Sequence, residues 1–423
     1  TKIRTNEPMT AVPCRRRDTC RLCGGNDLSM VLALTPTPPA NAFVEEAAKD
    51  IEQPCFPLDV YFCGTCAHVQ LLDIVDPGEL FENYVYVSGT SPTFVEHFDG
   101  YANDVTRRFE PPAGSLIVDI GSNDGTLLAA FKSRGFRVLG IDPARDIAAG
   151  ANKAGIETIA DFFSHELAAE IRESHVSAEV ITANNVFAHA DDLGGIVAGV
   201  RELLAPGGVF VFEVSYLADV IADTLFDTIY HEHLAYHSVK PLKRFFAEAG
   251  LELFSAVRVD SHGGSIRGMA GLAGGPHEAD GSVADLIALE QEIGLDRVET
   301  FRDFSADIEA LARRLKDLIT DIKAEGKSIA GFGAPAKATT LMYHFGIGSD
   351  EMDFIVDDSP LKQGLYTPGA HIPVLPPDAL YELRPDTVII LAWNFAEPIM
   401  DKHSAFLDAG GRFIVPLPEL KIY

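Results

Sequence analysis

Two Cys-x-x-Cys pairs near the N-terminus constrain the fold of this chain more than any other feature. The pairs are Cys20 with Cys23 and Cys63 with Cys66, and residues 24–62 separate them. Each pair lets two thiolates reach one ion from a tight turn, and two pairs complete a tetrahedral Zn²⁺ site with Zn–S distances of ~2.3 Å. We therefore expect one structural zinc ion on these four cysteines, because a closed four-sulfur site leaves no open position for catalysis.

Two disulfides, or four unconnected thiols, are the alternatives to zinc. The N-terminal stretch has no apolar core typical of a secretory signal, and no apolar run approaches the ~18 residues of a membrane span. We therefore expect a cytoplasmic protein, in which disulfides are rare and a metal site is favoured. The other two cysteines, Cys14 and Cys55, are interpreted as bystanders.

The charge of the chain restricts its partners. Its formal net charge is −28, while 47% of its residues are hydrophobic, so it is too apolar to be a disordered acidic chain. Nucleic acids and anionic membranes are bound through clustered Lys and Arg, so neither is expected as a partner. A small anion held locally is still compatible with this charge. The sequence leaves the oligomeric state open, and a monomer is compatible with it.

Apolar strands alternate with helical segments from residue 115 onward, a pattern typical of βαβ units and parallel sheets. A helical stretch at 283–325 separates two such units. We therefore predict an α/β protein, with a small zinc-binding domain at 1–80 followed by two Rossmann-like doubly wound domains. The first of these spans 81–280, and the second, which includes the helical linker, spans 281–423. Similar spacings in the two units leave open whether they are degenerate copies of each other.

The helical stretch carries one apolar face, because its large hydrophobic residues recur at spacings of three and four. These residues are Phe301, Phe304, Ile308, Leu311, Leu315, Ile319 and Ile322. The helix is expected to end at Gly326.

The middle unit has a glycine-rich loop between its first strand and its first helix, Gly121-Ser122-Asn123-Asp124-Gly125. A dinucleotide-binding loop carries Gly-x-Gly-x-x-Gly, which gives a pyrophosphate room to approach. Here Asn123 takes the place of the second glycine, and Asp124 would repel a pyrophosphate. An acidic loop instead suits a cationic ligand without phosphate, such as S-adenosylmethionine. NAD and a ligand-free turn are the alternatives.

Further polar residues follow the next strands of this unit. Asp142 ends the second strand, where a carboxylate can accept hydrogen bonds from two ribose hydroxyls. Asp161 and Phe162 follow the third strand and could take an adenine amine and cover the base. The expected cofactor contacts are Gly121, Ser122, Asn123, Asp142, Asp161, Phe162 and Asn184.

Three histidines lie close together in YHEHLAYH at 230–237. A zinc protease needs HExxH, with its imidazoles four residues apart on one helix face, whereas His231 and His233 are two apart. A metal site and a hydrogen-bonded polar turn remain alternatives. General-base catalysis is favoured over both, because imidazole titrates near neutral pH and Glu232 could orient its neighbour.

Six motifs together resemble a known family. They are the four cysteines, VDIGSNDG, ITANNVFAH, YHEHLAYHS, SHGGSIRG and GFGAPAKATT. The chain resembles the sugar C-methyltransferases of deoxysugar and antibiotic biosynthesis over essentially its whole length, and is most similar to those that methylate C-3′ in the D-tetronitrose pathway. The resemblance implies a zinc domain, an S-adenosylmethionine domain, and a C-terminal domain that holds a dTDP-linked 4-keto-sugar.

The resemblance also implies a reaction, methylation at C3 of a dTDP-3-amino-2,3,6-trideoxy-4-keto-hexose. It assigns His233 as the base, supported by Tyr230 and Glu232, and places Tyr84 and His189 in the active site. Chemistry agrees, because the carbon becomes nucleophilic only when the proton beside the ketone is removed and the enolate oxygen is stabilised. We expect His233 to take that proton, while Tyr230, Tyr84 or His189 donates to the oxygen.

A second glycine-rich loop, GFGAPAK, opens the C-terminal unit, and Asp357 lies 24 residues past its Gly333. This spacing alone would suit NAD. Lys337 in the first helical turn instead indicates a diphosphate held by backbone N–H groups and one ammonium, and the resemblance favours a nucleotide sugar. The expected substrate contacts are Gly333, Ala334, Lys337, Asn394 and Arg267. Trp393 is expected to be structural. A sugar that bridges two domains would require this loop to face the cleft of the middle domain.

The alternative to an enzyme is a non-catalytic regulatory protein that binds NAD or a nucleotide sugar and docks a partner through its zinc domain. A pure binding module has no need for Tyr230, Glu232 and His233 in one cluster. A zinc-knuckle RNA methyltransferase conflicts with the net charge.

Overall fold

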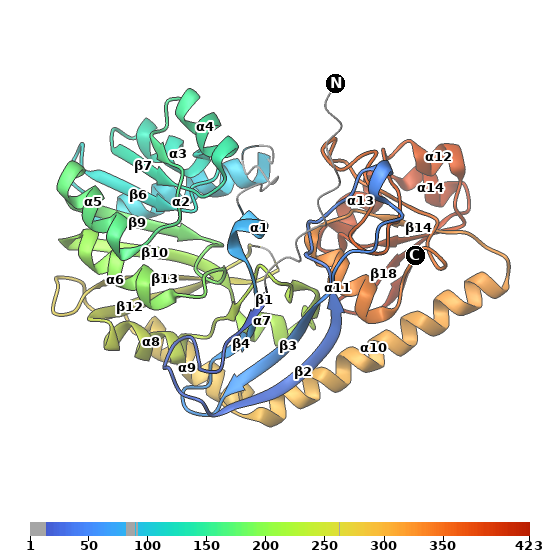
Figure 1. The fold of residues 1–423 in the computed structure, drawn as a ribbon, viewed down its shortest axis with the longest axis horizontal. Coiled ribbons are helices and arrows are strands. Elements are labelled where there is room, and N and C mark those ends of the chain that lie inside the picture. The colour runs from blue at the N-terminus through green and yellow to red at the C-terminus, as the bar shows by residue number, and fades with distance from the viewer. Residues whose placement is uncertain (1–13, 82–88, 90–91, 262) are drawn as a thin grey trace, which may run out of the picture.

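A computed structural model describes residues 14–81, 89, 92–261 and 263–423. Figure 1 shows two α/β lobes on either side of a strongly curved antiparallel sheet, with one long helix running beneath that sheet into the C-terminal lobe. Within the described ranges, no helix combines the length and the apolar character needed to cross a bilayer.

The N-terminal sheet has the strand order β11-β4-β3-β2, and its neighbours all pair antiparallel. Its strands are β2 (Leu28–Thr37), β3 (Phe56–Cys63), β4 (Val69–Leu71) and β11 (Ala235–Tyr236). A separate ribbon pairs β1 (Cys14–Arg16) with β5 (Asp73–Val75), and α1 (Pro77–Phe81) follows it. The short strand β11 comes from the middle of the sequence. The histidine-rich segment is therefore attached directly to the zinc domain.

The middle sheet has the order β12-β13-β10-β9-β6-β7-β8. Its five strands from β10 to β8 are parallel, and β13 and β12 add an antiparallel hairpin at one edge. The strands are β6 (Leu116–Ile120), β7 (Arg137–Ile141), β8 (Thr158–Ile159), β9 (Ala178–Asn184), β10 (Leu204–Ser215), β12 (Leu251–Val259) and β13 (Ser265–Leu272).

Helices cover both faces of the middle sheet, as the sequence predicts for a doubly wound unit. Because successive side chains of a strand point to opposite faces, Val209 and Val211 of β10 pack in the core with α2 and α3, while Phe210 and Phe212 pack with α6 and α8. The helices of this unit are α2 (Pro92–Phe109), α3 (Thr126–Ser133), α4 (Arg145–Lys153), α5 (His165–His175), α6 (Leu193–Leu203), α7 (Leu217–Ala222) and α8 (Val239–Glu248).

The C-terminal sheet has the order β16-β15-β14-β17-β18-β19, with only β19 antiparallel among these strands. Its strands are β14 (Ile329–Phe332), β15 (Phe354–Val356), β16 (Val374–Leu375), β17 (Thr387–Ile390), β18 (Arg412–Val415) and β19 (Lys421–Ile422). Its helices are α11 (Ala336–Phe345), α12 (Ala379–Leu383), α13 (Ala396–Lys402) and α14 (Ser404–Asp408). The expected α/β class, a zinc domain followed by two Rossmann-like units, is confirmed.

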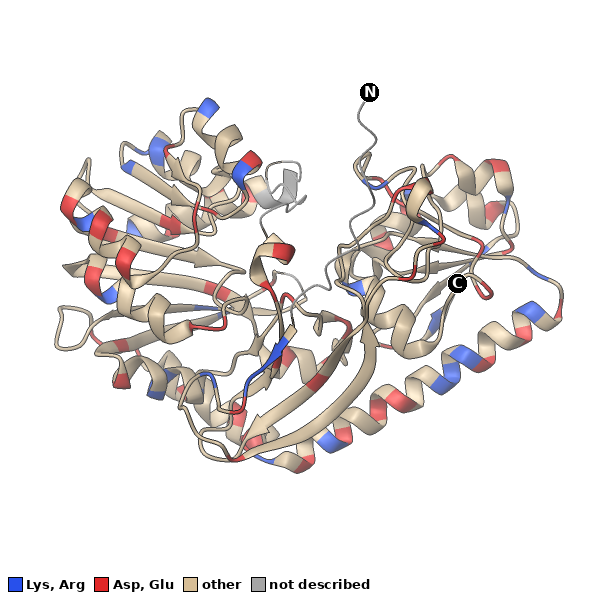
Figure 2. Cartoon of the chain, viewed as in Figure 1, with Lys and Arg blue, Asp and Glu red and all other residues tan. Residues whose placement is uncertain are grey.

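The long helical stretch is two helices, α9 (Ser282–Ile293) and α10 (Val298–Ala324), and the prediction of unbroken helix was wrong here. The break falls at Gly294, whose φ of +79° ends α9 in a left-handed turn. All seven apolar residues predicted for the second part form the buried face of α10. Phe301 packs against Phe62 of β3 with ring centroids 5.5 Å apart. Figure 2 shows charges of both signs along the other faces of α10.

Candidate functional site

The four predicted zinc ligands converge. The Sγ atoms of Cys20, Cys23, Cys63 and Cys66 all lie within 4.8 Å of one another. The Cys20–Cys66 and Cys23–Cys63 Sγ distances are both 3.6 Å, close to the ~3.8 Å edge of a tetrahedron with ~2.3 Å Zn–S bonds. The cluster therefore fits one zinc ion. Cys14 and Cys55, by contrast, are exposed.

The carboxyl ends of β6, β7 and β9 bring most of the expected cofactor contacts to one edge of the middle sheet. Gly121 has a φ of +69°, and a Cβ there would lie 2.2 Å from Val186, so only glycine fits. Asp142 accepts hydrogen bonds from the backbone N–H groups of Asn123 (2.8 Å) and Ala144 (2.9 Å) and so fixes the loop. Burial raises the pKa of Asp142.

Buried polar atoms at this edge test whether a ligand fits. Ser122 Oγ and the amide N and O atoms of Asn184 are buried and have no hydrogen-bond partner among the described residues. Unpaired buried polar groups are costly, so their presence at a glycine-lined edge indicates a polar ligand. Asp161 and Phe162 are both exposed beyond β8. These residues fit S-adenosylmethionine, which would bring a ribose, an amine and an adenine.

One acidic residue at this sheet escaped the sequence analysis. Asp119 of β6 is buried and accepts a 2.6 Å hydrogen bond from the Thr182 hydroxyl. Burial raises its pKa to about 7. A charged residue within the apolar segment LIVDI could have identified this position from the sequence.

The predicted catalytic histidines stack together. The rings of His189 and His233 lie 5.0 Å apart and nearly parallel, and Tyr230 lies 4.1 Å from His233 on the centroids. Phe81 stacks on His189 at 5.6 Å. Burial lowers the pKa of His189 to about 4, so this ring is neutral at neutral pH. Tyr84 lies outside the described residues.

The tautomer of His233 follows from its hydrogen bond. Its Nδ1 lies 2.7 Å from the carbonyl oxygen of Thr228. A carbonyl only accepts, so Nδ1 carries the proton and donates it, and the basic lone pair of the neutral ring is then on Nε2.

Glu232 and His231 contact residues of the zinc domain. Glu232 is buried, and its Oε1 accepts a 2.7 Å hydrogen bond from Asn41 Nδ2 in the zinc domain. His231 Nε2 lies 3.2 Å from the Phe56 carbonyl. His231 and His233 thus contact carbonyls in different parts of the chain, an arrangement that does not suit a metal ion shared between them.

The C-terminal lobe contacts the segment that leads into the histidines. Thr340 of α11 donates a 2.7 Å hydrogen bond to the Ile229 carbonyl, and Trp393 Nε1 donates a 2.6 Å hydrogen bond to Asp227. Lys337 Nζ lies 5.2 Å from the centre of the Trp393 ring. The C-terminal lobe is therefore joined directly to the segment that precedes the histidines.

The second loop mirrors the first. Gly333 has a φ of +84°, and Ala334 N–H donates to Asp357 at 2.7 Å, as Asn123 N–H does to Asp142. Lys362 was not predicted from the sequence; its Nζ donates a hydrogen bond to the Ala334 carbonyl at 2.7 Å. A lysine five residues past the acid was the available signal.

Two expected substrate contacts lie in different places. Asn394 is exposed beside Trp393 at the C-terminal loop. Arg267 lies in β13 of the middle sheet, where it pairs with buried Glu213 at 3.0 Å and stacks on Tyr101. The structure does not bring Arg267 together with the C-terminal loop.

Three families match consecutive parts of the chain. They are "Putative zinc binding domain" over residues 20–81, "Methyltransferase domain" over 94–256 and "C-methyltransferase C-terminal domain" over 260–418. These matches agree with the cysteine cluster and the glycine-lined edge described above. The cofactors are one zinc ion and S-adenosylmethionine.

Two solved structures resemble part of the chain. A protein from Pyrococcus horikoshii, PH0226, is 13% identical with a TM-score of 0.37 and covers 46% of this chain and 97% of its own. An S-adenosylmethionine-dependent methyltransferase from Clostridium acetobutylicum is 12% identical with a TM-score of 0.35 and covers 42% of this chain and 92% of its own. TM-scores this low say nothing about the site.

A curated relative matches almost the whole chain. The C-methyltransferase NovU of Streptomyces niveus is 37% identical over 405 residues, which are 96% of this chain and 96% of that protein. Through this relationship, the chain belongs to the sugar C-methyltransferase family.

Proposed function

We propose that this C-methyltransferase methylates C3 of a dTDP-3-amino-2,3,6-trideoxy-4-keto-hexose through an enolate. The observation that carries the proposal is the 2.7 Å hydrogen bond from His233 Nδ1 to the Thr228 carbonyl. It makes Nε2 the basic atom of a ring that contacts the rings of both Tyr230 and His189. A base in this position is required for methylation of a carbon beside a ketone, whereas methylation of an oxygen or a nitrogen does not need an enolate.

The neighbours of His233 suit the second requirement, stabilisation of the enolate oxygen. His189 is neutral because burial lowers its pKa to about 4, and a neutral imidazole still has one N–H to donate. The Tyr230 hydroxyl is a second candidate donor. Removal of one such donor typically costs about 10²–10³-fold in rate. Bound S-adenosylmethionine supplies an electrophilic methyl group on its sulfonium.

The C-terminal loop suits the dTDP group. Gly333 and Ala334 present backbone at the start of α11, and Lys337 and Lys362 place two ammonium groups beside it. A helix N-terminus with nearby cations is suited to bind the anionic oxygens of a diphosphate. Hydrogen bonds from Thr340 of α11 and from Trp393, whose ring centre lies 5.2 Å from Lys337 Nζ, join this lobe to the segment that leads into His233. One substrate could therefore be held at its diphosphate by one lobe while its sugar meets the base on the other.

Mass spectrometry of a panel of dTDP-4-keto-sugars, with S-adenosylmethionine as the methyl donor, tests this proposal. A product heavier by one CH₂, with the methyl on C3 of the 3-amino sugar, is the expected result. Methylation only at another carbon, or only of sugars without the C3 amine, would contradict the stated substrate. Calorimetry with S-adenosylhomocysteine and dTDP should also show two separate sites, and no binding of the first ligand would contradict the assigned cofactor edge.

A further inference from the structure

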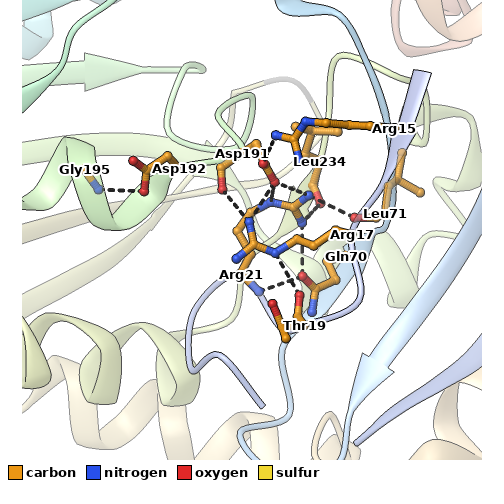
Figure 3. Close-up of polar contacts among 10 residues, drawn as sticks. All are labelled: Arg15, Arg17, Thr19, Arg21, Gln70, Leu71, Asp191, Asp192, Gly195 and Leu234. Atoms are coloured by element: carbon orange, nitrogen blue, oxygen red, sulfur yellow. Dashed lines mark hydrogen bonds and ion pairs between the residues drawn. The ribbon is translucent and has the colours of Figure 1, made fainter. Parts of the chain in front are cut away.

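One arginine sits inside the first zinc knuckle. Arg21 lies between the ligands Cys20 and Cys23, and its side chain is completely buried. Buried guanidinium groups are expensive unless every donor finds a partner. Figure 3 shows its side chain among polar groups that come from three separate parts of the sequence.

The donors of Arg21 are paired in several directions. Its NH1 donates to the Leu234 carbonyl at 2.9 Å and to Gln70 Oε1 at 3.1 Å. Its NH2 donates to the Leu71 carbonyl at 3.0 Å, and its Nε donates to Asp191 Oδ1 at 3.2 Å. A planar guanidinium can hold such a set of acceptors at once, whereas an ammonium cannot.

Two of these acceptors belong to the segments that carry the catalytic histidines. Leu234 follows His233 directly, and Asp191 lies two residues after His189. The two segments also contact each other, because the N–H groups of Leu234 and Ala235 both donate to the Ala188 carbonyl, at 2.9 and 3.1 Å. One side chain of the zinc knuckle therefore reaches both of the segments whose rings must stay stacked.

We propose that Arg21 is a positioning residue that holds the His189 and His233 segments in register against the zinc knuckle. Cys20 and Cys23, which flank Arg21, would be held in place by the zinc ion. The hydrogen bonds of Arg21 to Asp191 and Leu234 then hold the backbone next to His189 and His233. The structural metal thereby sets the geometry of the catalytic stack without touching substrate. This inference rests on the proposed function, in which His233 is the base.

Arg17 provides a matched control. It contacts the same carboxylate, since Arg17 NH1 lies 2.9 Å from Asp191 Oδ1. Its Nε donates to the Thr19 carbonyl at 2.8 Å, within its own segment. Arg15 also pairs with Asp191. Loss of Arg17 therefore removes an ion pair to Asp191 but leaves the link from Arg21 to Leu234 in place.

The test compares zinc-loaded full-length wild type, Arg21→Met, Arg21→Lys and Arg17→Met. Zinc content, affinity for S-adenosylhomocysteine, and deuterium uptake of residues 231–238 are measured first, because none of these needs turnover. For Arg21→Met we expect one zinc per chain, unchanged affinity for S-adenosylhomocysteine, and uptake at 231–238 about 10-fold faster than in wild type, as local opening becomes easier. Arg17→Met should stay within about twofold of wild type at these residues.

Turnover gives the second readout. Supporting groups around a site typically contribute about 10–100-fold, so kcat of Arg21→Met should fall by about that factor while KM for S-adenosylmethionine is unchanged. Arg21→Lys keeps the charge but cannot bind all the acceptors at once. Its kcat and its deuterium uptake at 231–238 should both lie between those of wild type and Arg21→Met. Equal uptake at 231–238 in Arg21→Met and Arg17→Met would overturn the proposal.

If Arg21→Met loses its zinc ion, the proposal is tested instead by comparing zinc-loaded Arg21→Lys with wild type. Faster uptake at 231–238 in zinc-loaded Arg21→Lys supports the positioning role, and uptake equal to wild type overturns it. Failure of the proposed function is distinguishable from both outcomes, because wild type itself would then show no methylation of the keto-sugar while the difference in uptake persisted.

Discussion

The contact between Trp393 and Asp227 predicts how strongly the C-terminal lobe is attached to the histidine segment. Asp227 is completely buried, and its Oδ2 accepts a 2.6 Å hydrogen bond from Trp393 Nε1. The substitution Trp393→Phe keeps an aromatic ring and removes this donor. A hydrogen bond to a charged group contributes about 1.5–3 kcal/mol, so we expect the free energy of unfolding to fall by about that amount wherever the Asp227 carboxyl is ionised.

The loss should depend on pH in a defined direction. Burial raises the pKa of Asp227 in the folded protein, while Lys337 and the Trp393 hydrogen bond act to lower it. Without the indole donor this pKa rises further. A raised folded-state pKa means that the folded state holds the proton more tightly, so stability is lost as pH rises through it. The cost of Trp393→Phe should therefore be largest above the folded-state pKa of Asp227, where the carboxylate is charged, and should shrink as the pH falls and the group becomes protonated.

A double-mutant cycle separates this hydrogen bond from the loss of indole volume. Urea unfolding followed by far-UV circular dichroism is measured for wild type, Trp393→Phe, Asp227→Asn and the double variant. We expect a coupling energy of about 1.5–3 kcal/mol between the two positions. Coupling below about 0.5 kcal/mol, the level at which independent sites add, would refute the reasoning.

Three other predictions follow from the same structure. Cys63→Ser should lose the zinc ion, and the backbone amides of the N-terminal sheet should lose their protection from hydrogen exchange. Cys55→Ser, which changes an exposed cysteine, should keep one zinc per chain by metal analysis. Burial lowers the pKa of His237 to about 4 from its usual 6.5, so the free energy of unfolding of wild type should fall as the pH drops from 6.5 toward 4. His237→Phe should make this dependence on pH smaller, as measured by urea unfolding at neutral and acidic pH. Trp393 is the only tryptophan, so dTDP binding beside Lys337 should change its fluorescence in a saturable way. Lys337→Met should weaken that binding about 10-fold or more. A titration with no change in emission would contradict a dTDP site at this loop.

Local patterns of the sequence were sufficient to predict the elements of the fold. Spacing alone identifies the four zinc ligands, because a Cys-x-x-Cys turn fixes where both thiolates point. Strand, loop and helix order likewise predicts both parallel sheets and the apolar face of α10. The break at Gly294 was missed, because an isolated glycine in a helical pattern can be tolerated within a helix or can end it.

Contacts between distant segments could not be predicted in this way. Arg21 looks like a surface residue in the sequence, since nothing near it reveals that Leu234 and Asp191 will surround it. Arg267 was assigned to the substrate, but it forms a buried ion pair with Glu213 in the middle sheet. Both positions depend on which strands become neighbours, and residue spacing along the chain does not determine that.

Solvent exchange at C3 tests the central claim most directly. The dTDP-3-amino-4-keto-sugar is incubated in D₂O with S-adenosylhomocysteine and either wild type or His233→Asn, and deuterium at C3 is followed by NMR. Wild type should exchange this hydrogen, and His233→Asn should lose about 10²–10⁴-fold in the exchange rate, the usual contribution of a general base. Exchange at the wild-type rate in His233→Asn, with one zinc per chain retained, would contradict the assignment of His233 as the base that generates the enolate.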